Sequence, residues 1–152
     1  MSVGEAASGD RLYDACRALA RAMDAFDEAA TRRLGVNRSD LRALNLLEHG
    51  PRSAASLAAD LSLTRAAVTT LVDRLVAAGY VSREPDPEDR RSVRIALLPA
   101  TWAAFADVYR PMGERVRASG AALPDEQGEA VVRALRRLAA DFDEVGATLG
   151  PR

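Results

Sequence analysis

Apolar residues recur along most of this chain at intervals of three and four, the spacing that places one apolar stripe on an α-helix. The first row predicts a long helix ending near Leu34, because glycine is common just after a helix and Gly35 follows. Two further rows predict two helices in the last third of the chain. The rows are Leu12, Cys16, Leu19, Met23, Phe26 and Ala30; Leu98, Trp102, Phe105, Tyr109, Met112 and Val116; and Val131, Leu135, Leu138, Phe142, Val145 and Leu149.

Some segments depart from this helical spacing. Residues 1–9 are small or polar and are predicted to be frayed. Pro111 lies inside the second apolar row and has no backbone N–H, so a kink or a break is expected near residues 107–110. Residues 119–124 contain glycine and proline and are predicted to form a loop.

Three shorter helices are predicted between the rows, each after a typical N-cap residue. Asn37, Ser53 and Thr64 precede them, and their side-chain oxygens can accept a hydrogen bond from an unpaired backbone N–H. Residues 62–63 form the turn between the second and third helices, and Gly79 ends the third. The residues expected to face inward are Leu41, Leu44 and Leu47; Ala54, Leu57, Ala58 and Leu61; and Val68, Leu71, Val72, Leu75 and Val76.

Beyond Gly79 the pattern becomes that of a β-hairpin. β-Branched and aromatic residues occupy 80–83 and 93–97, and a proline- and aspartate-rich loop separates them. The predicted fold is therefore mainly α with a small β-hairpin, a winged helix-turn-helix core over residues 36–98. Helices over 10–35 and 99–149 flank this core within a single integrated domain.

Composition narrows the function classes. The chain has 152 residues, enough for one domain with a real core, and its 21 basic and 22 acidic residues create no global field toward nucleic acid or membrane. Between residues 38 and 94 there are nine arginines and eight acidic residues, a balance that neither supports nor excludes DNA binding. No apolar run approaches the ~20 residues of a membrane span, and no signal peptide is evident, so the cytoplasm is expected.

A single cysteine and a single histidine limit the possible chemistry. They exclude an internal disulfide framework and a zinc site built from cysteine and histidine. Neither lies beside a recognisable nucleophile or metal pattern, so the chain is predicted not to be an enzyme and to need no cofactor or metal.

The three long rows contain more apolar residues than the core of one small domain needs to bury. We therefore expect the flanking helices to form an arm that dimerises two copies of the chain. The alternative is that these helices pack on one another within one chain.

The central residues carry a family resemblance. In order along the chain they are Leu71-Val72-Asp73-Arg74-Leu75, Gly79-Tyr80-Val81 and Pro85-Asp86-Pro87-Glu88-Asp89-Arg90-Arg91-Ser92-Val93. Over about residues 36–98 the chain resembles the MarR family of bacterial transcriptional regulators, and the combination is more specific than any single piece. One departure is that the family often continues with leucine, threonine and a nearby glycine, where this chain has Leu97-Leu98-Pro99-Ala100-Thr101-Trp102.

A helix of this kind reads the major groove through its N-terminal and outward side chains. Arg65 or Arg74 is expected to read a guanine, and threonine hydroxyls are expected to contact phosphates. The alternative for Arg74 is an ion pair with a neighbouring acid. The candidates on the helix are Thr64, Arg65, Thr69, Thr70 and Arg74.

The resemblance implies that the wing enters the adjacent minor groove. Arg91 is then its tip, Asp89 orients the guanidinium and Arg90 lies beside them. Four arginines and four acids lie between residues 83 and 94, so a solvated hairpin without this role is the alternative.

The resemblance also implies a homodimeric repressor on a pseudo-palindromic operator, released by a small aromatic or phenolic ligand. Such a ligand would enter between arm and core and change the spacing of the two heads. Apolar residues at helical spacing are usually plain core, and this is the favoured alternative for each candidate. The candidate lining residues are Met23, Phe26, His49, Trp102 and Tyr109.

Two other functions stay open. Winged helices also serve as protein-interaction modules without DNA binding. Some members of the family sense hydroperoxides through a cysteine in the first helix, but Cys16 lies on an apolar seam, which favours an unreactive thiol.

Overall fold

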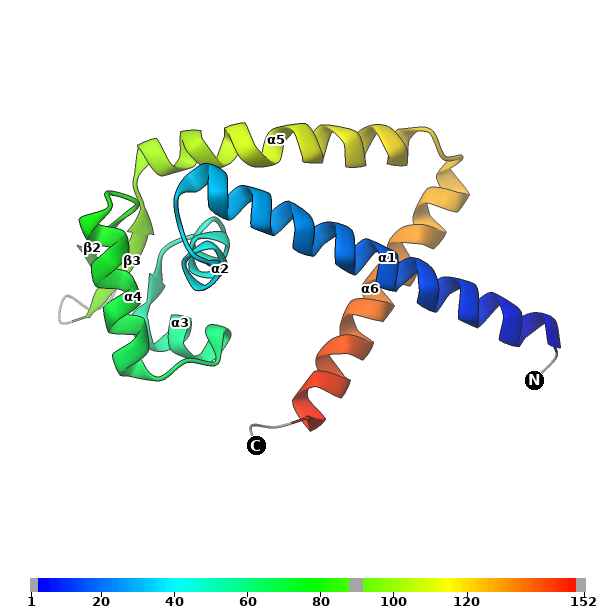
Figure 1. Ribbon diagram of the computed structural model, residues 1–152, viewed down its shortest axis with the longest axis horizontal. Coiled ribbons are helices and arrows are strands. Elements are labelled where there is room, and N and C mark those ends of the chain that lie inside the picture. Colours follow the sequence, from blue (N-terminus) through cyan, green and yellow to red (C-terminus); the bar gives the residue numbers. More distant parts are fainter. Residues whose placement is uncertain (1–2, 88–91, 150–152) are drawn as a thin grey trace. The chain divides into compact units, whose positions relative to one another are not determined.

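The computed structural model describes residues 3–87 and 92–149 of the chain. Its elements are α1 (Val3–Leu34), α2 (Arg38–Leu47), β1 (Arg52–Ser53), α3 (Ala54–Leu61), α4 (Arg65–Ala77), β2 (Val81–Pro85), β3 (Val93–Leu97), α5 (Pro99–Ala121) and α6 (Asp125–Thr148), as Figure 1 shows. The predicted fold class, mainly α with a small β-hairpin, is confirmed. The chain divides into two compact units, residues 1–108 and 109–152, and the division falls within α5.

The predicted N-caps are confirmed. The side chains of Asn37, Ser53 and Thr64 each accept a hydrogen bond from a backbone N–H in the first turn of the following helix. At α2 the cap is reciprocal, because the carboxylate of Asp40 also accepts from the backbone N–H of Asn37. Gly35 has a φ of 68°, the left-handed conformation that glycine adopts without a steric penalty, and it follows α1 as predicted.

The sheet has one strand that the pattern did not indicate. Its order is β1-β3-β2, all antiparallel, with Ile95 of β3 opposite both Arg52 and Arg83. The β2–β3 hairpin was predicted, whereas β1 contains two residues and is too short to carry an alternating pattern. This strand fixes the start of α3 against the hairpin.

Most of the residues predicted to face inward are buried in the core of the first unit. Val76 is an exception, 36% exposed, because eight residues after Val68 it has turned roughly 80° away from the buried stripe. Ala54 is exposed and Ala58 half-buried. The buried apolar residues include Leu41, Leu44, Leu47, Leu57, Leu61, Val68, Leu71, Val72, Leu75, Val81, Ile95 and Phe105.

Two expectations about helix boundaries were wrong. α1 begins at Val3 rather than beyond residue 9, because this segment contains alanine and glutamate, both strong helix formers. α5 continues through Pro111, so a break near residues 107–110 is absent, whereas a kink there stays a prediction. A proline removes one backbone hydrogen bond, and the bonds of the neighbouring turns hold this helix together. Pro99 is the first residue of α5, a position where its fixed φ suits a helix.

The second unit consists of the end of α5, a short connection and α6. α6 begins with Asp125 and Glu126, whose negative charges suit the positive end of the helix dipole. Its apolar seam is exposed in the single chain. The exposed residues are Val131, Val132, Leu135, Phe142, Val145 and Leu149.

Candidate nucleic-acid interface

The N-terminal half of α4 presents its outward face to solvent. Arg65, Thr69 and Thr70 are exposed on it, together with Ala66. Within residues 3–87 and 92–149, the guanidinium of Arg65 has no hydrogen-bond or ion-pair partner, so its five N–H donors are available to a ligand. α4 is therefore a rigid, well-capped helix with one available guanidinium near its start.

The threonines of α4 differ in what they can offer to a phosphate. The Thr69 hydroxyl donates to the carbonyl oxygen of Arg65 at 3.0 Å, and the Thr70 hydroxyl donates to that of Ala66 at 3.1 Å. Each hydroxyl has one proton, so a phosphate contact from either would break the bond inside the helix. Thr64 instead accepts from the Ala67 N–H at 3.2 Å, and its own proton stays available.

Arg74 is held by an acid from another helix. Its Nη2 and Nε atoms donate to the two carboxylate oxygens of Asp40 on α2, at 2.5 and 3.1 Å. This hydrogen bond raises the pKa of Arg74 above its ordinary value. The arrangement is the ion pair that sequence reasoning offered as the alternative to a base contact.

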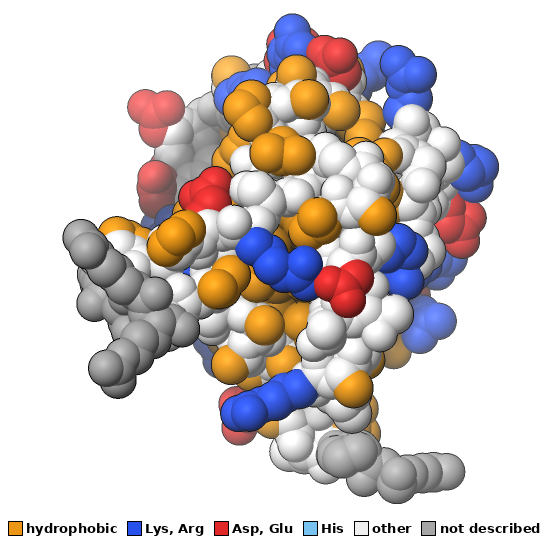
Figure 2. Space-filling model, turned by 90° about the vertical axis from the view of Figure 1, so that its left-hand side faces the viewer, with side chains coloured by type: hydrophobic (Ala, Val, Ile, Leu, Met, Phe, Trp, Pro, Cys, Tyr) orange, Lys and Arg blue, Asp and Glu red, His pale blue; other side chains and the backbone are white. Residues whose placement is uncertain are grey.

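Several other arginines within residues 38–87 and 92–97 also have acidic partners. Arg83 on β2 contacts Asp73 on α4 at 2.5 Å. Arg94 contacts Asp86 at 3.7 Å and donates to the carbonyl oxygen of Pro51 at 3.3 Å. Figure 2 views this side of the molecule, where basic and acidic side chains lie interspersed among apolar and uncharged ones.

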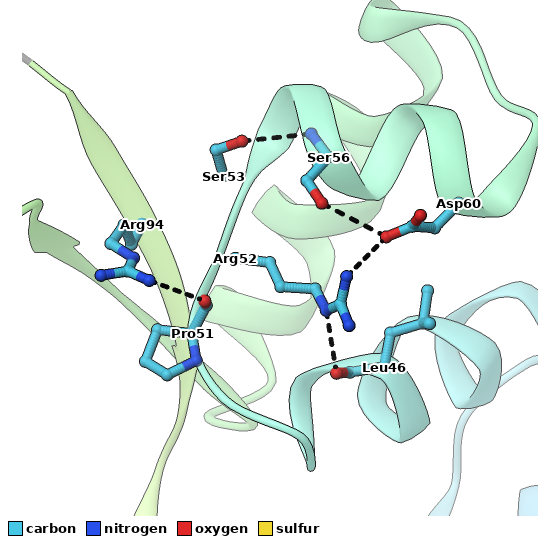
Figure 3. A network of polar contacts seen from close by, with 7 residues as sticks. All are labelled: Leu46, Pro51, Arg52, Ser53, Ser56, Asp60 and Arg94. Carbon is cyan, nitrogen blue, oxygen red and sulfur yellow. Dashed lines mark hydrogen bonds and ion pairs between the residues drawn. The ribbon is translucent and has the colours of Figure 1, made fainter.

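Arg52 joins three elements, as Figure 3 shows. Its Nε donates to the carbonyl oxygen of Leu46 at the end of α2, and its Nη1 contacts Asp60 on α3 at 2.7 Å. Ser56 donates to the same carboxylate at 3.2 Å. The sequence pattern predicted neither this network nor the role of Asp40. For Asp40 the one available signal was the Asn37-x-x-Asp40 spacing, which is typical of a capping box.

The predicted wing tip lies outside the described residues. Asp89, Arg90 and Arg91 all fall within 88–91. At the base of this loop the backbone N–H of Asp86 donates to the carbonyl oxygen of Ser92 at 2.9 Å.

The five candidate ligand residues occupy different elements. Met23 and Phe26 are on α1, the former 60% exposed and the latter half-buried. Trp102 and Tyr109 are on α5, and Tyr109 belongs to the second unit. His49 lines two shallow hollows of about 240 and 360 Å³ in the winged core, and the other four candidates line neither hollow.

Three further features bear on the predictions. Cys16 is a free, half-buried thiol on α1. Within residues 3–87 and 92–149, no group of three or more His, Cys, Asp or Glu side chains could hold a metal ion. None of the helices described combines the length and apolar character needed to cross a membrane.

Comparison with known proteins identifies the family. A family model described as MarR family matches residues 34–92. The uncharacterized HTH-type transcriptional regulator YcgE of Bacillus subtilis (strain 168) is 44% identical over 90 residues, which is 59% of this chain and 58% of that protein. YkoM of the same organism, also an uncharacterized HTH-type transcriptional regulator, is 30% identical over 128 residues, 81% of this chain and 83% of that one.

A solved structure has the same fold. The MarR family protein from Bacillus stearothermophilus superposes with a TM-score of 0.69 at 24% identity, covering 94% of this chain and 99% of that chain. The structural likeness and the sequence match agree on a winged helix-turn-helix. This chain belongs to the MarR family and is a transcriptional regulator.

Proposed function

We propose that the chain is a homodimeric, sequence-specific DNA-binding repressor, with α4 in the major groove and the β2–β3 wing in the minor groove. The observation that carries this proposal is the exposed start of α4, where the Arg65 guanidinium has no partner among the described residues. A helix fits the major groove, and a guanidinium at its start can donate two hydrogen bonds to a guanine.

The remaining contacts are assigned by the chemistry available to each side chain. The Thr64 hydroxyl can donate its proton to a phosphate. The hydroxyl protons of Thr69 and Thr70 are already bonded to backbone carbonyl oxygens of α4, so these residues are less suited to a phosphate contact. Asp89, Arg90 and Arg91 stay proposed wing contacts on the family motif. Arg74 is the least suited of the original candidates to contact a base, because Asp40 occupies its guanidinium.

The homodimer is supported by the exposed apolar seams. On α1 the residues Leu12, Leu19 and Met23 are exposed, and α6 leaves its own row uncovered in the single chain. Covering such side chains contributes about 1.5–3 kcal/mol for each one fully buried. A two-fold dimer formed by residues 10–35 and 99–149 would present two winged cores to half-sites about 34–36 Å apart.

Repression requires no surface beyond the DNA contact, because an occupied operator excludes other proteins from the same DNA. Release by a small aromatic or phenolic ligand is part of the proposal. Met23, Phe26, His49, Trp102 and Tyr109 are the residues to test for it. The ligand would have to favour one spacing of the two heads by a few kcal/mol.

The test is selection of bound sequences from a random duplex library, followed by footprinting and a salt titration. The expected result is a two-fold symmetric site whose affinity falls steeply with salt concentration. A chain that enriches no sequence, but copurifies with a protein partner, would instead be an interaction module.

A further inference from the structure

Asp40 is a buried carboxylate with its acceptors directed to two different elements. The residue is 3% exposed, and it lies in the first turn of α2. Its Oδ2 accepts from the Nε of Arg74 and, at 3.5 Å, from the backbone N–H of Asn37. Its Oδ1 accepts from the Nη2 of Arg74. One side chain therefore caps α2 and binds α4 through Arg74.

The geometry of this pair resists rotation. Two parallel N–H···O bonds between a planar guanidinium and a planar carboxylate fix both orientation and distance, which a single contact does not. The two residues are 34 positions apart in sequence, so no local element determines their separation. Fixing Arg74 near the C-terminal end of α4 sets how that helix lies on α2.

The other arginine of α4 is in the opposite situation. Arg65 is exposed in the first turn, and its guanidinium has no partner in the described part of the chain. Moving Arg74 toward a base would leave the buried Asp40 carboxylate with only the Asn37 N–H, a costly loss for a desolvated charge. Arg74 is therefore held by a contact within the protein, whereas the Arg65 guanidinium is available to contact a ligand.

We infer that Asp40 and Arg74 are positioning residues for operator recognition: they hold the angle of α4 so that Arg65 meets its base, and Arg74 itself reads no base. The inference rests on the proposed DNA binding. It adds Asp40, for which the sequence offered only a capping-box spacing, to the residues that determine specificity.

The experiment compares affinities for two duplexes of equal length. One is the duplex that the wild-type chain selects from a random library, and the other is a scrambled version of it. The variants are Asp40→Asn, Arg74→Gln and the double variant, which removes the buried charge together with its partner. Arg65→Gln is the matched control, because it removes an arginine from the same helix and leaves the Asp40–Arg74 pair intact.

Each single variant is expected to bind the selected duplex about tenfold more weakly, as expected for loss of a coupled pair. Affinity for the scrambled duplex should change by less than about twofold, since phosphate contacts tolerate small rotations of the helix. The double variant should bind no more weakly than the weaker single variant. Arg65→Gln should alter which base is preferred in each half-site, a change not expected from Asp40→Asn.

Two results would overturn the inference. If Arg74→Gln loses affinity while Asp40→Asn retains it, or if the losses multiply in the double variant, Arg74 contacts DNA directly. If the variants lower only the melting temperature and keep the ratio of selected to scrambled affinity, the pair merely stabilises the fold. A wild-type chain that selects no sequence contradicts the proposed function itself, and the inference with it.

Discussion

The phenolic hydroxyl of Tyr80 donates a hydrogen bond to the backbone carbonyl oxygen of Leu34, the last residue of α1. The carbonyl oxygen of Tyr80 accepts from the Leu98 N–H at 3.0 Å and from the Thr101 hydroxyl at 2.6 Å. Tyr80 lies between α4 and β2, so one residue directly after α4 connects the end of α1 and the start of α5 to the winged core.

Tyr80→Phe should lower the free energy of unfolding by about 1 kcal/mol, the typical net contribution of one hydrogen bond. The measurement is urea denaturation followed by circular dichroism. Tyr13→Phe is the control, since that tyrosine is 59% exposed on α1 and its hydroxyl accepts a long, solvent-exposed bond of 3.4 Å from Arg17, so its removal should change stability little. Equal stability of Tyr80→Phe and the wild type would show that the hydrogen bond from Tyr80 to Leu34 does not stabilise the fold.

Arg74→Ala should destabilise the fold by about 2 kcal/mol, because it leaves the Asp40 carboxylate buried with one weak partner. Adding Asp40→Asn should recover a large part of this loss. Arg83→Ala serves as the comparison: its pair with Asp73 is exposed on both sides, and such pairs contribute about 0–1 kcal/mol. Equal losses in Arg74→Ala and Arg83→Ala would contradict the argument.

The same pair should give no pH dependence in the neutral range. Asp40 raises the pKa of Arg74 in the folded chain, so this stabilisation is present below the unfolded pKa of arginine and is lost only as the pH rises through the higher folded value. Both values lie far above neutrality. The difference in unfolding free energy between wild type and Arg74→Ala, measured at several neutral pH values, should therefore be constant as far as Arg74 is concerned.

Thr70→Val should keep DNA affinity within about twofold, because the hydroxyl proton that valine lacks is already bonded to the Ala66 carbonyl. Thr70→Ser, which keeps the hydroxyl and removes the methyl group, is the paired variant, and both are measured by anisotropy titration on the selected duplex. A tenfold loss in the valine variant alone would assign the hydroxyl to a DNA contact.

Leu135→Glu should shift the chain from dimer to monomer, since it places a charge on the exposed seam of α6. Sedimentation equilibrium measures the change, and Arg136→Glu on the same helix controls for the added charge. An unchanged dimer would mean that the seam of α6 is covered in another way.

Arg91→Ala should weaken binding to all sequences and reduce the slope of log affinity against log salt by about 1, the effect of losing one backbone-directed cation. A mobility-shift titration at several salt concentrations tests this. Unchanged binding at every salt concentration would exclude Arg91 as a wing contact.

Local signals in the sequence predicted much of this fold. The caps at Asn37, Ser53 and Thr64 were foreseeable because each depends on residues within one turn. The Asp40–Arg74 pair was not, because its members meet only after α2 and α4 pack together. The internal bonds of Thr69 and Thr70 depend on a rotamer choice that hydrophobic periodicity does not contain. The sequence therefore could not show that the hydroxyl protons of Thr69 and Thr70, expected to contact phosphates, are already bonded inside the helix.

The sheet order β1-β3-β2 also affects how the chain behaves at high concentration. β2 is an outer strand, and its exposed end carries Arg83, Glu84 and Pro85. A proline has no N–H to offer a further strand, and adjacent charges oppose stacking of like edges. Growth of this sheet into aggregates is therefore disfavoured at this edge. In the proposed dimer, the two copies associate through the exposed apolar residues of their helices and not through this sheet edge.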